Sequence, residues 1–112
     1  MGVLIIANRL MKELFWTSHS KFKMGYYRLS GSGVRRVLKS PERIEEGIAD
    51  NTIALMQPNG RGKSAHEIWV MVFDTDDKRR VISAWRYPGQ TKPGQALPSE
   101  ILKEFEEASS YI

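Results

Sequence analysis

Residues 67–89, EIWVMVFDTDDKRRVISAWRYPG, decide the fold of this chain. Residues 68–73 are apolar at every position, which is typical of a central strand that is covered on both faces. The polar residues 74–78 predict a short turn, and residues 79–87 predict a returning strand. This strand should end at Pro88, because proline cannot donate a hydrogen bond to a strand ladder. The stretch therefore predicts an antiparallel hairpin at the centre of a sheet.

Alternation along the returning strand predicts which of its side chains share a face. The predicted faces carry Val81, Ser83, Trp85 and Tyr87 on one side and Ile82, Ala84 and Arg86 on the other. The returning strand thus combines an apolar centre with a polar, cationic end. We expect any functional chemistry to lie near that end.

Helices are predicted ahead of the hairpin. Apolar residues at helical spacing indicate an amphipathic helix over residues 3–15, although its β-branched start also allows a strand in the first turn. A second helix should begin with Thr17 or Ser18 as its N-cap. A third helix should cover residues 33–39, with Ser32 as its N-cap.

The remaining segments complete an α+β pattern. Residues 43–48 fit either a short strand or an extended passage, and residues 52–56 predict a strand by composition. Turn formers in residues 57–65 predict a flexible loop. After the hairpin, Ser99 is expected to cap a last helix. The predicted fold is therefore N-terminal helices, a three- or four-stranded antiparallel sheet and a C-terminal helix.

The composition limits the classes of protein to consider. The 112 residues are enough for a single domain over residues 1–112, and the hydrophobic content of 41% indicates a folded globule. No apolar run reaches the roughly 18–20 residues of a membrane span. Cysteine is absent and the histidines are His19 and His66 alone, so no metal or other cofactor is expected. These features favour a cytoplasmic protein that does not bind membranes.

Positive charge is concentrated early in the chain. Residues 1–41 carry eight Lys or Arg against one acid, although the net charge of the whole chain is only +4. Such a segment indicates a surface that faces phosphates or an acidic partner. The candidate nucleic-acid-binding residues are Lys21, Arg28, Arg35, Arg36, Lys39 and Ser83.

Four residues could cleave RNA without a metal: His19, Lys23, Arg86 and Tyr87. Attack by a 2′-hydroxyl needs a base, an acid for the leaving oxygen and a cation for the developing charge. His, Lys and Tyr exchange protons, and Arg stabilises an oxyanion through two hydrogen bonds. Structural alternatives are open for His19, as a capping or core residue, and for Arg86, as an ion-pair partner of Glu45, Glu46 or the acidic last helix.

Two stretches carry a family resemblance: HSKFKMGYYRLSGSGVRRVLKSPERIEEGI, residues 19–48, and EIWVMVF followed by VISAWRYPG. Together they resemble a small bacterial domain group that looks like the BrnT and RelE toxin superfamily, whose fold includes colicin D-type and barnase-like ribonucleases. The resemblance spans about residues 16–102 and implies one or two helices ahead of a twisted antiparallel sheet. It matches His19 to a helix-opening His and Arg28 to the Arg before a Leu-Ser turn. It also matches Ser83 and Arg86 to polar positions of the last strand.

Three functions are compatible with these observations. The first is a metal-independent endoribonuclease of toxin type that acts on RNA and pairs with a cognate acidic antitoxin-like protein. The second is a non-catalytic RNA- or DNA-binding module. The third is a protein-interaction domain, such as a homodimer formed through the helix over residues 3–15. Convergence of His19, Arg28 and Arg86 in one open cleft would favour the first.

Overall fold

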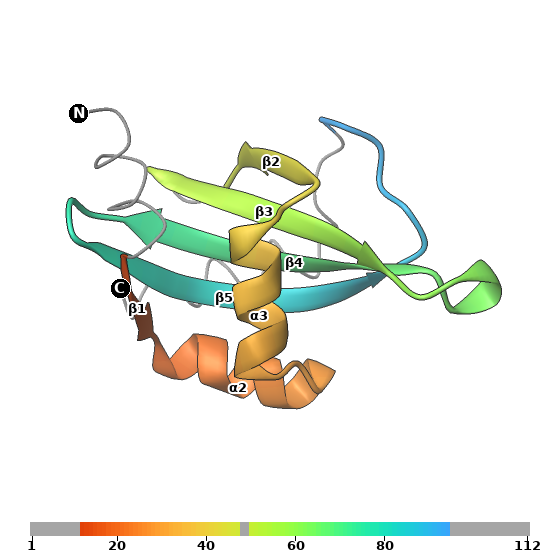
Figure 1. Ribbon diagram of the computed structural model, residues 1–112, viewed down its shortest axis with the longest axis horizontal. Helices are drawn as coiled ribbons and strands as arrows, with labels where there is room; N and C mark the ends of the chain where they lie inside the picture. Colours follow the sequence, from red (N-terminus) through yellow and green to blue (C-terminus); the bar gives the residue numbers. More distant parts are fainter. Residues whose placement is uncertain (1–11, 48–49, 95–112) are drawn as a thin grey trace.

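The computed structural model describes residues 12–47 and 50–94 of the chain. Its elements are β1 (Glu13–Trp16), α2 (Ser18–Tyr27), α3 (Gly31–Lys39), β2 (Arg43–Glu46), β3 (Thr52–Asn59), a short 3-10 helix η1 (Gly62–Ser64), β4 (His66–Asp74) and β5 (Lys78–Pro88). The described strands form one five-stranded sheet in the order β1-β5-β4-β3-β2 (Figure 1). The predicted C-terminal helix and residues 3–11 of the predicted first helix lie outside the described residues.

The α+β class is confirmed, but the sheet differs from the prediction. It is mixed and five-stranded, rather than antiparallel with three or four strands, because β1 pairs in parallel with β5. The other strand pairs are antiparallel. Residues 43–46, which fitted either a strand or an extended passage, form β2 at the opposite edge.

The prediction that residues 13–15 belong to the first helix is wrong. Residues 13–15 belong to β1, in which Leu14 and Trp16 are partly buried while Glu13 and Phe15 are exposed. This alternation has the period of two that a strand requires. The apolar positions 14 and 15 also fit a helical repeat, so spacing alone could not exclude a helix here. Pairing with the edge of β5 decides the outcome.

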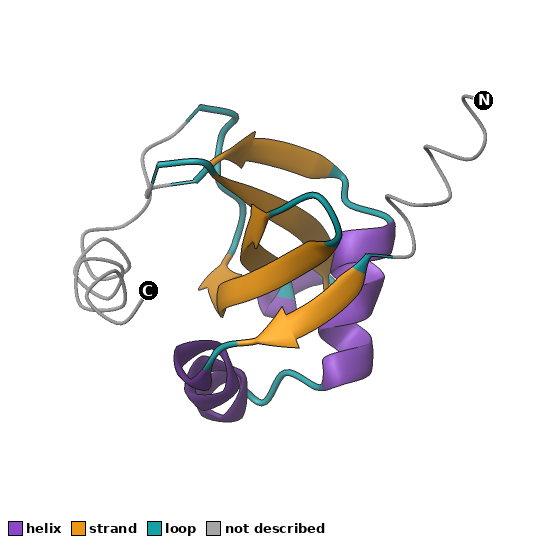
Figure 2. Ribbon diagram, turned by 90° about the vertical axis from the view of Figure 1, so that its left-hand side faces the viewer, coloured by secondary structure: helices purple, strands orange, loops and turns teal. Residues whose placement is uncertain are grey.

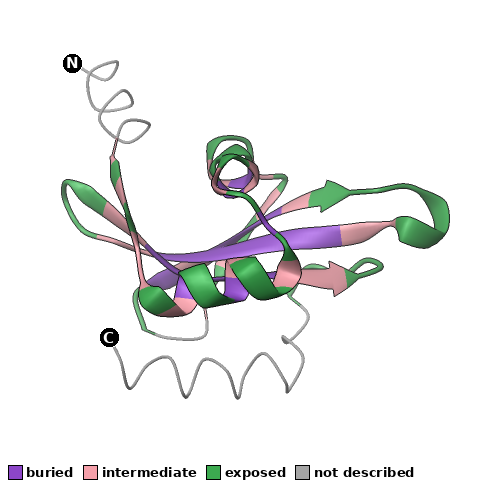
Figure 3. Ribbon diagram, turned by 90° about the horizontal axis from the view of Figure 1, so that it is seen from below, coloured by how far each residue is buried: buried purple, intermediate pink, exposed green. Residues whose placement is uncertain are grey.

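Strand β4 is buried on both faces, as predicted. Ile68, Val70 and Val72 pack in one core cluster with residues of α3. Trp69 and Met71 lie in a second cluster on the other face, where Trp69 stacks against Trp85 with ring centroids 6.0 Å apart. The buried stretches of the sheet are purple in Figure 3. One strand therefore supplies both cores.

A bulge changes the predicted faces of β5. Met71 pairs with Ser83, but the next residue, Val72, pairs with Val81, so Ile82 is an additional residue in β5. Val81 consequently packs in the cluster that contains Ala84, and Ile82 packs in the cluster that contains Trp85. The strict alternation predicted for residues 81–87 is wrong at this point.

The predicted loop over residues 57–65 begins later than expected. Residues 57–59 continue β3 and pair with β4. Pro58 is tolerated in this strand because β2 pairs only with residues 53–56. None of the described strands therefore needs an N–H from Pro58 on that side.

Helix α3 covers one face of the sheet, and α2 lies along its β5 edge with Met24 and Tyr27 packed against the same core cluster. Figure 2 shows α2 nearly end-on below the edge of the sheet and α3 beside one face. Helix α3 begins at Gly31, because the Ser30 hydroxyl accepts a hydrogen bond from the amide of Gly33 at 3.0 Å. Ser30, and not the predicted Ser32, is therefore the N-cap. Among the described helices, none is long and apolar enough to cross a membrane.

Candidate functional site

Helix α2 is fixed along the edge of β5 from its first residue. The Thr17 hydroxyl accepts from the amide of Ser20 at 3.0 Å, so Thr17, one of the two predicted candidates, is the N-cap. The same hydroxyl donates to the carbonyl of Val81 at 3.0 Å. The helix ends at Arg28, which adopts the left-handed conformation with φ of 55°. Its outer surface is thereby held in one orientation relative to the sheet.

Arg86 closes the C-terminal end of α2. Its Nε donates to the carbonyl of Tyr27 at 2.8 Å, and its Nη2 donates to the carbonyl of Arg28 at 3.2 Å. These carbonyls belong to the helix end, where acceptors lack a partner within the helix and a cation is favourable. Arg86 makes no ion pair with a described acidic residue, so the structural alternative of a pair with Glu45 or Glu46 is not found in the described part of the chain.

The structure does not bring His19 and Arg86 together. His19 lies in the first turn of α2 and is partly buried. Arg86 binds Tyr27 and Arg28 at the other end. Eight residues separate positions 19 and 27, which corresponds to about 12 Å along a helix axis. The predicted catalytic pair, and the convergence of His19 with Arg86 in one cleft, is therefore not formed.

His66 is the neighbour of Arg86 that sequence reasoning missed. Nη1 of Arg86 lies 2.8 Å from Nε2 of His66, and Nδ1 of His66 lies 2.8 Å from the carbonyl oxygen of Ser64. A guanidinium can only donate, so Nε2 of His66 is the acceptor in this contact. The signal was available in the hairpin register. Ile68 pairs with Arg86, so His66 lies two residues away on the same face.

The other predicted catalytic residues and Ser83 lie in packed surroundings. Lys23 is only 3% exposed, and its Nζ lies 4.9 Å and 5.0 Å from the ring centroids of Tyr26 and Tyr27. Ser83 is buried opposite Met71 in the sheet. Tyr87 is partly buried and packs against the second core cluster. None of the three is on an open surface with His19 or Arg86.

The predicted nucleic-acid-binding residues other than Ser83 are basic, and all of them are exposed. They are Lys21, Arg28, Arg35, Arg36 and Lys39, and we call this set the basic surface. None of them makes an ion pair with a described acidic residue. The guanidinium of Arg35 lies 5.5 Å from the ring centroid of Trp16, which places α3 next to the segment that enters α2. Both helices are labelled in Figure 1.

Two large aromatic side chains are also exposed on α2. Phe22 and Tyr26 are each 69% exposed and lie one helical turn apart. The exposed turns of α2, which lies along the lower edge of Figure 1, face the viewer in Figure 3. An aromatic ring such as that of Tyr26 commonly packs in a core, but here it is exposed, because its side of α2 does not face the sheet.

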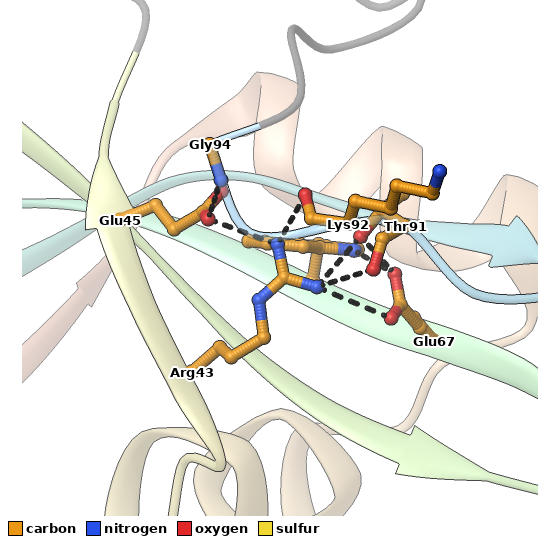
Figure 4. Close-up of polar contacts among 7 residues, drawn as sticks. Arg43, Glu45, Glu67, Thr91, Lys92 and Gly94 are labelled. Atoms are coloured by element: carbon orange, nitrogen blue, oxygen red, sulfur yellow. Dashed lines mark hydrogen bonds and ion pairs between the residues drawn. The ribbon is translucent and has the colours of Figure 1, made fainter.

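A separate polar network (Figure 4) lies on the face of the sheet that carries Trp69, opposite to the face that α3 covers. Arg43 on β2 donates to Glu45 at 2.9 Å and to the carbonyl of Thr91 at 2.8 Å, and it lies 3.6 Å from Glu67. The Thr91 hydroxyl donates to Glu67 at 2.7 Å, and Trp69 Nε1 donates to the same carboxylate at 3.1 Å. These contacts satisfy a buried carboxylate and bind the segment after β5 to the sheet. Their role is structural.

The environment of Glu45 lowers its pKa. Burial of the carboxyl raises the pKa, but the amide of Gly94 and the guanidinium of Arg43 stabilise the carboxylate more strongly. Gly94 donates to Glu45 at 2.8 Å, and Arg43 donates to the same oxygen at 2.9 Å. The pKa of Glu45 therefore lies below its ordinary value of 4.5.

The described residues contain no group of three or more His, Cys, Asp or Glu that could hold a metal ion. Comparison of the chain with protein families, with curated proteins and with solved structures finds no match. The resemblance to the BrnT and RelE toxins consequently depends on the quoted residues alone and stays a prediction.

Proposed function

We propose that this domain binds nucleic acid, in the first instance RNA, through the basic surface of α2 and α3. The observation that carries the proposal is the charge of residues 17–41, which contain no Asp or Glu. Exposed Lys and Arg residues that lack an acidic neighbour remain available to bind phosphates. The arrangement thus supports the non-catalytic binding function better than the other two.

Two other arginines of the chain, Arg43 and Arg79, have structural roles in which acidic residues bind them. Arg79 forms two hydrogen bonds with Asp74, at 2.7 Å and 2.8 Å, and Arg43 contacts Glu45 and Glu67. In both cases a carboxylate neutralises the guanidinium. The basic surface has no such acids, so its positive potential extends into solvent and attracts a polyanion.

Binding of a labelled RNA, measured by fluorescence anisotropy at several salt concentrations, tests the proposal. We expect affinity to fall steeply as salt rises, because each phosphate contact releases a counterion. The double variant Arg35→Gln and Arg36→Gln should bind more weakly. For a single strand, the slope of log K against log salt should decrease by about 0.7 for each phosphate that the variant no longer neutralises.

The double variant Lys63→Gln and Lys78→Gln is the matched control. It also removes two charges, from η1 and from the first residue of β5, where both lysines are exposed but lie outside the basic surface. Its affinity and salt slope should equal those of the unmodified protein. Absence of RNA binding at low salt, or an equal loss of affinity in the control and the arginine double variant, would contradict the proposal.

Cleavage of bound RNA, the activity that the toxin resemblance implies, is a separate prediction. The distance between His19 and Arg86 along α2 does not support the candidate catalytic set. The binding samples also test this point, because RNA that is still full length after prolonged incubation shows no cleavage. If fragments appear, His19→Ala and Arg86→Ala variants identify whether either residue is needed.

A further inference from the structure

We infer that Phe22 and Tyr26 form a stacking platform for the bases of a single-stranded nucleic acid. This inference rests on the proposed function and specifies the substrate class. Both rings are 69% exposed and belong to α2, which also carries Lys21 and Arg28 of the basic surface. Aromatic rings placed among cations are the combination by which proteins bind single strands, since every base has a face that can stack.

The spacing of the two rings suits consecutive bases. Residues at i and i+4 lie on the same side of a helix with Cβ atoms about 5–6 Å apart. Phe22 and Tyr26 therefore face solvent together, with Gly25 beside them. A Cβ at Gly25 would meet no atom within 4 Å, so the space next to Tyr26 is open. A planar base can approach the helix backbone there.

Neighbouring side chains orient Tyr26 before any ligand binds. Its ring meets that of Tyr27 edge to face, with centroids 4.8 Å apart and an angle of 79° between the planes. The ammonium of Lys23 lies 4.9 Å from the Tyr26 centroid. A ring that is already oriented loses less rotational freedom when a base stacks on it, which favours affinity.

Charge complementarity identifies the occupant. Lys21 immediately precedes Phe22, Arg28 follows Tyr26 by two residues, and both cations are exposed. A strand whose bases lie on the rings can place its phosphates near these two side chains. The bases of a duplex are stacked on one another and their faces are covered. The platform therefore selects single-stranded nucleic acid over a double helix.

Anisotropy titrations with a single-stranded RNA and with a hairpin duplex of the same length and dye test the inference. The variants Phe22→Leu and Tyr26→Leu keep an apolar side chain but remove the ring. We expect each to weaken single-strand binding by about 5-fold to 150-fold, the range that loss of one base–aromatic stack produces. The salt slope should not change, because no cation is removed. Duplex binding should change little.

Phe15→Leu is the matched control, because Phe15 is 52% exposed but lies on β1. It should bind the single strand as the unmodified protein does. Ultraviolet cross-linking followed by mass spectrometry should place cross-linked nucleotides on the peptide that contains Phe22 and Tyr26. Circular dichroism of each variant verifies that the fold is retained.

Distinct outcomes overturn the two proposals. Normal single-strand binding by Phe22→Leu and Tyr26→Leu, or equal affinity for strand and duplex, overturns the platform even if Arg35→Gln with Arg36→Gln still weakens binding. Absence of binding by the unmodified protein overturns the proposed function itself. Sedimentation that shows a dimer, converted to monomers by the leucine variants, would assign these rings to a self-interface and also overturn the platform.

Discussion

At the residue scale, the partners of an arginine decide what it does. Arg43 contacts two carboxylates, Glu45 on its own strand β2 and Glu67 on β4. Arg86 contacts two backbone carbonyls and His66, so it closes a helix end. The guanidinium group is the same in both residues. That of Arg43 stabilises buried negative charge, whereas that of Arg86 binds carbonyl oxygens that lack a partner within the helix.

Glu45 gives this network a pH dependence. Its pKa in the folded protein is lowered, so the interaction stabilises the fold above the unfolded pKa of about 4.5 and is lost as pH falls through the folded pKa. We expect Glu45→Gln to unfold at a lower urea concentration than the unmodified protein at pH 7. The difference between their midpoints should shrink as pH falls below about 4.5. Urea titrations at several pH values measure it, and a constant difference would contradict the prediction.

Residue types alone predicted only some of these roles. The N-cap of α2 was narrowed to Thr17 or Ser18, because a cap depends on a local hydrogen bond to an amide two or three residues later. The exposure of Lys21, Arg28, Arg35, Arg36 and Lys39 also followed from charge. The partners of Arg86 could not be predicted in this way. Tyr27 is 59 residues distant in sequence and becomes a neighbour only through the fold, whereas His66, 20 residues distant, follows only from the register of the hairpin.

At the scale of the element, α2 contains a glycine that weakens it without an evident packing role. Gly25 lies inside the helix, and an added Cβ would meet nothing within 4 Å. We expect Gly25→Ala to raise the free energy of unfolding by about 1 kcal/mol, because alanine has the higher helix propensity and restricts the unfolded chain. Urea or thermal unfolding measures this change.

Gly60 provides the contrasting substitution. Its φ of +74° is in the left-handed region, and a Cβ would lie 2.3 Å from the carbonyl oxygen of Ser64. Gly60→Ala should therefore destabilise the protein, since both the backbone conformation and the contact oppose a side chain. Stabilisation by Gly60→Ala, or destabilisation by Gly25→Ala, would be inconsistent with the described geometry.

Elements with an unambiguous repeat were predicted better than those without one. The β4–β5 hairpin followed from its apolar run, and α2 and α3 followed from their apolar spacing, although the predicted cap of α3 was wrong. Strand β1 is only four residues long, too short for a period of two to be distinguished from a helical turn. The bulge at Ile82 could not be predicted, because it depends on how β5 matches β4 rather than on β5 alone.

At the scale of the whole molecule, the sheet separates residues that the sequence suggested would meet. Helix α2 lies along β5, with its start bound to Val81 and its end bound by Arg86. A site that needs His19 and Arg86 together is therefore incompatible with this placement. The prediction from charge is unaffected, because a basic surface does not require distant residues to meet in one site. The basic surface needs only exposure and the absence of acids from residues 17–41.

Because the two core clusters share β4, we expect the protein to unfold cooperatively. Of the 3 tryptophans, Trp69 and Trp85 are each 1% exposed and stack with 4° between their planes, whereas Trp16 is only partly buried on β1. A Trp16→Phe variant would make fluorescence report the core cluster away from α3. Because β4 contributes to both clusters, opening one face should remove the support of the other.

We therefore expect the urea midpoint measured by fluorescence of Trp16→Phe to coincide with the midpoint measured by far-ultraviolet circular dichroism, as in a two-state transition. The circular dichroism signal includes α2 and α3, while the fluorescence reports Trp69 and Trp85 on the other face. A fluorescence midpoint at lower urea would show that this face opens while the helices remain folded. In that case β4 would not couple the two cores, and its burial on both faces would be a matter of packing alone.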